Sequence, residues 1–204
     1  MEKFFNDAGI FRLGYLKNKP KNNYEFYFFR KGEAKYIGVI GMGMHAQKRE
    51  NSPVLSEKPD NTTLKLVEKA HVYNVRTKEY MGYTDIVPVS LKLDHPEFFA
   101  LLPYKVEKFD VSSKYEADNH SIVYSGKVNE KDANERLIMV NVFEPDGILS
   151  VPYSHKIWTV KGAFYNVFPL ALNDKSGKWK LELTDVISGF KVQNIVEVGR
   201  RNNK

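Results

Sequence analysis

The chain has 204 residues, a formal net charge of +6, 13 % aromatic residues and no cysteine. This length allows one large β domain or two of about 100 residues each, and the absence of cysteine excludes disulfides and thiolate metal sites. The positive charge is scattered, so nucleic acid is not an expected partner, and no stretch approaches the roughly 18 apolar residues of a membrane span.

The amino-terminal segment predicts a short helix over residues 1–9, with Phe4 and Phe5 on one side and Gly9 at its end. A helix this short is unstable unless it packs on something. We therefore expect it to be the tail of a preceding domain. The segment has no basic stretch followed by an apolar one, so no secretory signal is visible.

Residues 10–102 predict a set of short antiparallel strands. The clearest pair is a hairpin with strands at 24–30 and 35–41, because both runs are apolar and a glycine-containing turn joins them. Residues 42–60 break the pattern and predict a long loop. Pro88 indicates an edge strand or a bulge. The remaining strands are expected at 10–17, 62–67, 70–75, 80–82, 87–93 and 97–102.

The second half begins after a short connection at 103–108, with strands expected at 109–112 and 120–128. Residues 137–198 then read as short strands separated by turns, such as the turn at 144–147. Trp179, Leu181 and Leu183 alternate with polar residues, which predicts a half-buried strand with Trp179 as a core anchor. Regular turns at this spacing are typical of a β-sandwich.

The predicted fold is therefore all-β, with two antiparallel β domains. Residues 1–105 form the first domain, which includes the short N-terminal helix. Residues 106–204 form the second, an immunoglobulin-like β-sandwich.

No motif in the sequence predicts catalysis, a cofactor or a metal. The five histidines stand far apart and none has the spacing of a zinc motif. Gly41 and Gly43 resemble a dinucleotide fingerprint, but no βαβ unit follows, so they indicate a glycine-softened strand end. Carboxylate pairs such as Glu182 with Asp185 are not placed in a recognisable pocket. We therefore predict no catalytic, cofactor-binding or metal-binding residue.

Aromatic side chains are the remaining functional candidates, because their faces stack on sugar rings and on protein partners. Most are expected in the core and two or three at a surface site. We predict contact with a carbohydrate or a protein partner at Tyr80, Tyr153 and Trp158. The wider set of aromatics in excess of the needs of a small core is Tyr24, Tyr27, Tyr36, Tyr80, Tyr83, Tyr153, Trp158 and Tyr165.

Several phrases resemble the carboxy-terminal modules of large bacterial proteins related to family 42 β-galactosidases. VNVFEPDG at 140–147 and FPLALNDKSGKWKLELTDVISG at 168–189 resemble their β-sandwich, with Glu144, Lys175 and Ser188 in place of the usual Asp, Pro and Thr. The preceding domain of those proteins is similar to RKGEAKYIGVIG at 30–41, AHVYNVRTKEYMGYTD at 70–85 and FFALLPYKVEKFDV at 98–111. EKFFNDAGI at 2–10 is similar to the last helix of a trimerisation-type domain.

The resemblance implies a non-catalytic accessory region of a carbohydrate-active enzyme, supporting assembly or carbohydrate contact. The catalytic acids would lie in an upstream barrel of about 250 residues, so none is carried over. The implied partners are a carbohydrate or the upstream catalytic region of a longer protein, and the implied location is periplasmic or extracellular. The alternative is a cell-surface protein-protein interaction module of the macroglobulin or fibronectin type. A hydrolase within these residues is a distant third.

Overall fold

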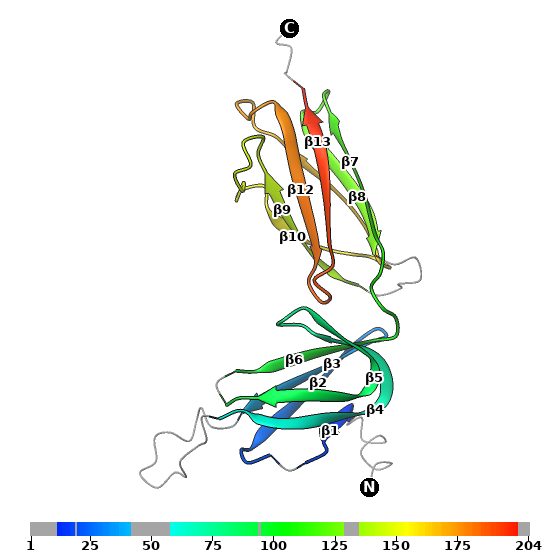
Figure 1. The fold of residues 1–204 in the computed structure, drawn as a ribbon. Helices are drawn as coiled ribbons and strands as arrows, with labels where there is room; N and C mark the ends of the chain where they lie inside the picture. Colours follow the sequence, from blue (N-terminus) through cyan, green and yellow to red (C-terminus); the bar gives the residue numbers. More distant parts are fainter. Residues whose placement is uncertain (1–11, 19, 42–57, 94, 129–134, 200–204) are drawn as a thin grey trace. The chain divides into compact units, whose positions relative to one another are not determined.

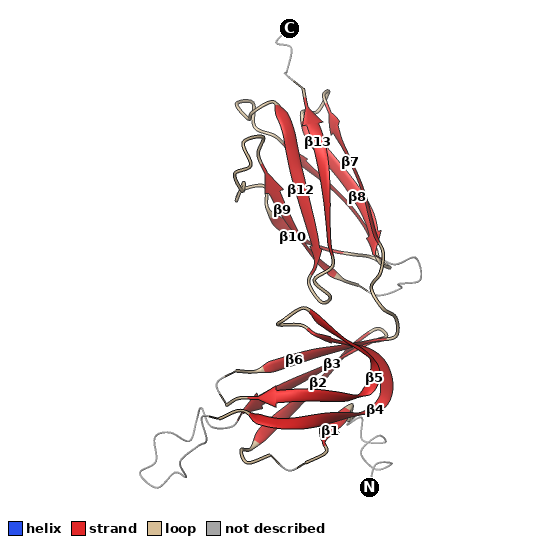
Figure 2. Ribbon diagram, viewed as in Figure 1, coloured by secondary structure: helices blue, strands red, loops and turns tan. Residues whose placement is uncertain are grey.

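The computed structural model describes residues 12–18, 20–41, 58–93, 95–128 and 135–199, and its regular elements in these ranges are all β-strands (Figures 1 and 2). The chain divides into two compact units, with the boundary between Lys105 and Val106. The helix predicted over 1–9 and most of the predicted loop over 42–60 lie outside the described residues. Within the described ranges, no helix is long and apolar enough to cross a membrane.

The first unit is one antiparallel sheet of six strands. Its order is β1-β4-β6-β3-β2, and β5 pairs with β4. The predicted hairpin is confirmed as β2 and β3, whose two-residue turn places Gly32 at a φ of 59°. The strands are β1 Gly14–Leu16, β2 Tyr24–Lys31, β3 Ala34–Gly41, β4 Asp60–Asn74, β5 Glu79–Leu91 and β6 Glu97–Leu102.

The β4–β5 hairpin corrects the prediction of four separate short strands in this region. Both strands are continuous, and the register shifts between Lys65 and Ala70. The polar residues in that interval interrupt the alternation, which predicts a strand end. In the structure the β4–β5 ladder accommodates them as a register shift and continues beyond them. Among the described strands β5 pairs only with β4, which confirms the edge position indicated by Pro88. β1 is shorter than the strand predicted for 10–17.

The core of the first unit lies on one face of this sheet. Ile37, Leu64 and Phe99 are buried there, and Phe26 and Phe28 pack against them from β2. At the end of β3, a Cβ added at Gly41 would lie 2.6 Å from the Leu93 Cα. Gly41 is therefore required for the close approach of two backbone segments. The dinucleotide-like glycine thus has a packing explanation.

The second unit is built from two antiparallel sheets, one ordered β10-β9-β12-β13 and the other β11-β8-β7. The Asn194 amide on β13 donates to the Val111 carbonyl oxygen on β7 at 3.1 Å, which ties the two sheets together. This arrangement is sandwich-like. The strands are β7 Phe109–Glu116, β8 Ser121–Val128, β9 Leu137–Phe143, β10 His155–Trp158, β11 Ala163–Pro169, β12 Gly177–Asp185 and β13 Lys191–Val198.

The alternation predicted for β12 is confirmed. Trp179, Leu181 and Leu183 are fully buried, and the polar residues between them face the other side. The indole Nε1 of Trp179 donates to the Lys175 carbonyl oxygen at 2.9 Å, so its one polar group is satisfied. The turn after β9 is also confirmed, with Gly147 at a φ of 82°.

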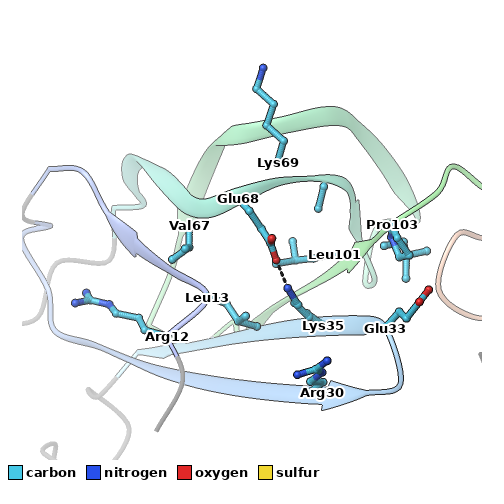
Figure 3. Close-up of a pocket in the computed structure, with 12 residues that line it drawn as sticks. Arg12, Leu13, Arg30, Glu33, Lys35, Val67, Glu68, Lys69, Leu101 and Pro103 are labelled. Atoms are coloured by element: carbon cyan, nitrogen blue, oxygen red, sulfur yellow. Dashed lines mark hydrogen bonds and ion pairs between the residues drawn. The ribbon is translucent and has the colours of Figure 1, made fainter. Parts of the chain in front are cut away.

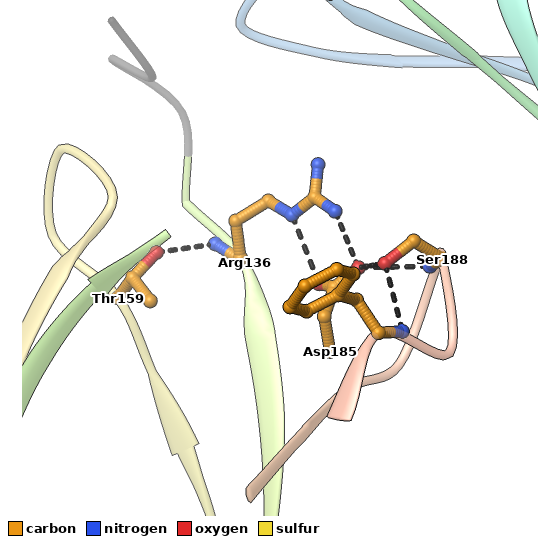
Figure 4. A network of polar contacts seen from close by, with 5 residues as sticks. Arg136, Thr159, Asp185 and Ser188 are labelled. Carbon is orange, nitrogen blue, oxygen red and sulfur yellow. Dashed lines mark hydrogen bonds and ion pairs between the residues drawn. The ribbon is translucent and has the colours of Figure 1, made fainter. Parts of the chain in front are cut away.

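A buried ion pair closes one end of the second unit (Figure 4). The Arg136 guanidinium donates to both oxygens of Asp185, at 3.0 Å from Nε and 2.5 Å from Nη2. The Ser188 amide and hydroxyl donate to the same carboxylate, and Thr159 accepts from the Arg136 amide. Asp185 therefore orders a strand end and is removed from solvent, which explains an acid that the sequence left without a role.

Candidate functional site: the aromatic face of the first unit

The three predicted contact residues lie in different surroundings. Tyr80 is half-buried on β5, where its hydroxyl and the His71 Nδ1 form a hydrogen bond of 2.7 Å. The ammonium of Lys105 lies 5.3 Å from the centre of the Tyr80 ring. Tyr80 is therefore partly occupied by contacts within its own unit.

Tyr153 and Trp158 belong to the second unit. The Tyr153 ring packs against Phe168 and Trp179, at centroid distances of 5.3 and 5.7 Å. Its hydroxyl donates to Asp174 and accepts from the Ala171 amide, and burial, followed by the hydrogen bond to Asp174, raises the pKa of Tyr153. Tyr153 is thus a structural residue beneath the loops. Trp158 ends β10 and is 58 % exposed.

Aromatic side chains gather instead on the outer face of β2, β3 and β6. Tyr27 and Phe29 are 42 % and 51 % exposed, because the odd residues of β2 point away from the core. The ring of Tyr36 stacks on Phe98 at 5.7 Å with an interplanar angle of 8°, and Phe29 lies 6.3 Å from Phe98. We call these four residues the aromatic patch.

Gly38 lies at the centre of the aromatic patch. It is the cross-strand neighbour of both Tyr27 and Phe98. A Cβ at this position would meet Tyr27 Cβ and Phe98 Cδ2 at 3.6 Å, so the glycine leaves a shallow floor between the rings. A flat surface with a low floor and aromatic walls can receive a planar or ring-shaped apolar group.

A second aromatic group lies on the same outer face, where the β4–β5 ladder shifts register. Val72 pairs with Gly82 but Tyr73 pairs with Tyr80, so one extra residue is accommodated and Gly82 adopts a φ of 102°. This bulge turns Tyr80 and Tyr83 to one side although they are three residues apart. The His71 ring contacts both, at centroid distances of 5.9 and 4.8 Å.

One cross-strand row connects the two groups. It runs Phe29, Tyr36, Ala100, Tyr73 and Tyr80 across five strands. Ala100 and Tyr73 are buried. They separate the aromatic patch from the second aromatic group, which consists of His71, Tyr80 and Tyr83, on the surface. Tyr83 is 60 % exposed, so the outer face carries two separate aromatic areas, and the aromatic patch is the one with two exposed rings, Tyr27 and Phe29.

A polar group borders the aromatic patch on β2. The Tyr27 hydroxyl donates to Glu25 at 2.6 Å, and this hydrogen bond raises the pKa of Tyr27 above its ordinary value. The hydroxyl stays protonated and holds the carboxylate beside the rings. Such a combination supplies apolar stacking and a hydrogen-bond acceptor to the same ligand.

A hollow of about 510 Å³ opens at another part of the first unit (Figure 3). The Lys35 ammonium and the Glu68 carboxylate form an ion pair at its centre. The side chains of Arg12 and Lys69 extend away from this pair in Figure 3. The charged groups do not converge on one point, so we assign no ligand to this hollow.

Three of the five histidines make local contacts with tyrosines. The rings of His71, His120 and His155 each share a hydrogen bond with a tyrosine hydroxyl, from Tyr80, Tyr115 and Tyr124 respectively. In the described part of the chain, no group of three His, Cys, Asp or Glu side chains could hold a metal ion.

Phe29 and Phe98 were not among the aromatics singled out from the sequence. The alternation in residues 24–31 does place Tyr27 and Phe29 on one face, but it does not say which face is buried. Phe98 joins them only through the pairing of β3 with β6, which connects segments about 60 residues apart.

The fold and this surface define a class: an all-β protein of two antiparallel units, the first of which exposes an aromatic patch on its sheet. No family model matches the chain, and a search of curated proteins gives no match.

Proposed function

We propose that the chain is a non-catalytic accessory region that contacts carbohydrate through the aromatic patch. The observation that carries the proposal is the exposure of Tyr27 and Phe29 beside the stacked rings of Tyr36 and Phe98. The C–H groups on the face of a sugar ring carry partial positive charge, and an aromatic face carries the complementary negative charge. The hydroxyl groups at the edge of the sugar would meet polar groups such as Glu25.

The flat shape of the aromatic patch favours a sugar chain over a small enclosed ligand. Neighbouring strands lie about 4.8 Å apart, so three strands place rings over roughly 10 Å, which is the length of about two sugar units. The glycine floor at Gly38 lets a ring approach the sheet. The proposed ligand class is therefore an oligosaccharide that lies across β2, β3 and β6.

We also propose that the second unit is an immunoglobulin-like sandwich that acts as a structural support. Seven antiparallel strands in sheets of four and three support this assignment. Trp179, Leu181 and Leu183 are fully buried, so this unit forms its core without a cystine.

A glycan array combined with a hydrolysis screen tests the proposed function on the whole chain. We expect saturable binding to a subset of glycans and no turnover. The bound glycan is then titrated against Phe29→Ala and Tyr36→Ala, which should each weaken binding about tenfold or more through the loss of one stacked ring.

Tyr165→Ala is the matched control, because Tyr165 is a 70 % exposed strand tyrosine of the second unit. It should leave the affinity unchanged. Carbohydrate contact would be contradicted if no glycan on the array bound, or if neither Phe29→Ala nor Tyr36→Ala changed the affinity. Turnover would contradict the non-catalytic assignment.

The second candidate is a protein-protein interaction module, and one observation favours it. Ile148, Val151 and Leu172 are largely exposed at one end of the second unit. Leu149 and Val151 line the same hollow as the two residues that flank Leu172. Exposed aliphatic side chains on adjoining loops are typical of protein interfaces. A partner whose binding is lost in Val151→Asp and kept in Phe29→Ala would favour this function.

A further inference from the structure

The edge strand β2 differs from ordinary edge strands. Among the described residues it pairs only with β3, over eight consecutive positions without a register shift. It contains no proline, and five of its eight residues are Phe or Tyr. A long, straight and aromatic edge is a template for pairing with another strand.

The edge strand β5 of the same sheet shows the usual protection. It carries Pro88, a register shift at Gly82 and a second shift after Lys65. An ion pair between Lys65 and Asp85 adds charge along it. These devices prevent pairing with a further strand. The contrast indicates that β2 is used for pairing and that β5 is not.

The charges of β2 fit a second copy of the same strand. Glu25 lies near its start and Lys31 at its end, both on the outer face. When two copies run antiparallel and are centred on Phe28, each Glu25 lies opposite the Lys31 of the other copy. Tyr27 then lies opposite Phe29, so on the outer face charged residues meet opposite charges and aromatic residues meet aromatic residues.

The hydrogen-bonding pattern of β2 suits this register. The two-residue turn makes Lys31 and Ala34 a hydrogen-bonded pair, so the odd residues of β2 direct their N–H and C=O groups to β3. The even residues, including Phe28 and Arg30, direct theirs to the other edge. In the paired strands, Glu25 and Lys31 of the two copies then form non-hydrogen-bonded pairs, whose Cα atoms lie about 4.5 Å apart.

We propose that two copies of this chain dimerise by antiparallel pairing of their β2 strands, centred on Phe28. The twofold axis is perpendicular to the sheet, so the outer faces of both copies stay on one side. The two aromatic patches then adjoin across the new pair of strands. The dimer goes beyond the proposed carbohydrate contact and is tested separately from it.

Sedimentation of the full chain over a range of concentrations tests the dimer. We expect a monomer–dimer equilibrium in which Glu25→Lys and Lys31→Glu each raise the dissociation constant about tenfold or more, because each creates two like-charge pairs. The double variant Glu25→Lys/Lys31→Glu should restore the dimer. An equal mixture of the two single variants should form a heterodimer, since both of its charge pairs are again complementary.

Two further variants keep the test decisive. Arg30→Pro removes a backbone N–H on the free edge without removing one from the β2–β3 ladder, so it should abolish the dimer and keep the circular dichroism spectrum. Lys178→Glu, an exposed change on β12, should alter neither. A monomer at every concentration would overturn the proposal. The proposal would also be overturned if Glu25→Lys and Lys31→Glu left the dissociation constant unchanged. The same holds if neither the double variant nor the mixture of the single variants restored dimerisation.

Discussion

Trp179 shows how much stability a single residue can carry in this protein. Its side chain is fully buried, packs against Tyr153 and has its indole N–H satisfied. Trp179→Ala should lower the free energy of unfolding of the second unit by about 3 to 5 kcal/mol, because it opens a cavity and deletes a large apolar group. Urea titration measures the change.

Tyr165→Ala serves as the control for Trp179→Ala, since the Tyr165 ring is mostly exposed. It should change the free energy of unfolding by less than about 0.5 kcal/mol. An unchanged urea midpoint in Trp179→Ala would show that the indole is not a core anchor.

Asp60 makes the stability of the first unit depend on pH. Burial alone would raise the pKa of Asp60, but hydrogen bonds from the Asn22 amide at 3.1 Å and the Tyr24 hydroxyl at 2.9 Å outweigh it, with help from Lys21. The pKa is therefore lowered from its ordinary value of 3.8. Stability from the ionised carboxylate is present above that value and is lost as pH falls through the folded-state pKa.

Asp60→Asn should remove this pH dependence. The wild-type free energy of unfolding of the first unit should fall more steeply than that of the variant below about pH 4, and the variant should be less stable at about pH 7. Urea titrations at several pH values measure both. Asp110→Asn, a change at an exposed acid of the second unit, should leave the first unit's profile unaltered. Parallel profiles for wild type and Asp60→Asn would refute the role of Asp60.

At the scale of elements, glycines decide how closely strands and side chains approach. A Cβ at Gly126 on β8 would lie 2.5 Å from the Phe164 Cζ and closer still to the Asp110 carbonyl oxygen on β7. Gly126→Ala should therefore destabilise the second unit by about 1 to 3 kcal/mol, the range for overpacking. Thermal unfolding measures it.

Gly38→Ala is the control for Gly126→Ala, because Gly38 is also a strand glycine. Its added methyl group would meet neighbours at ordinary contact distances, so the melting temperature of the first unit should change little. A large loss of stability in Gly38→Ala, or none in Gly126→Ala, would contradict the packing described for these strands.

The elements also show where sequence reasoning succeeds. The β2–β3 hairpin and β12 were predicted because two-residue alternation and a glycine turn are local signals. β4 and β5 were predicted in pieces, because residues such as Glu68 and Lys69 interrupt the alternation. Their continuity depends on a cross-strand ladder that tolerates a register shift, and such a ladder is not visible in one strand alone.

At the scale of the whole molecule, the two compact units should unfold in two separable transitions, because each has its own buried core. Asp60→Asn should shift one transition and Trp179→Ala the other. Calorimetry of the full chain and of the two variants measures this. A single transition that both changes shift equally would show that the units unfold as one.

The sequence by itself determined the all-β class and the burial of Trp179, Leu181 and Leu183. These features follow from local periodicity and turn chemistry, which act within a few residues. The tertiary structure alone decided that Phe98 joins Tyr27 and Phe29, that Tyr80 and Tyr83 share a face, and that Tyr153 is structural. Those outcomes depend on strand pairing between distant segments, where a shift of one residue exchanges the buried face of a strand for the exposed one.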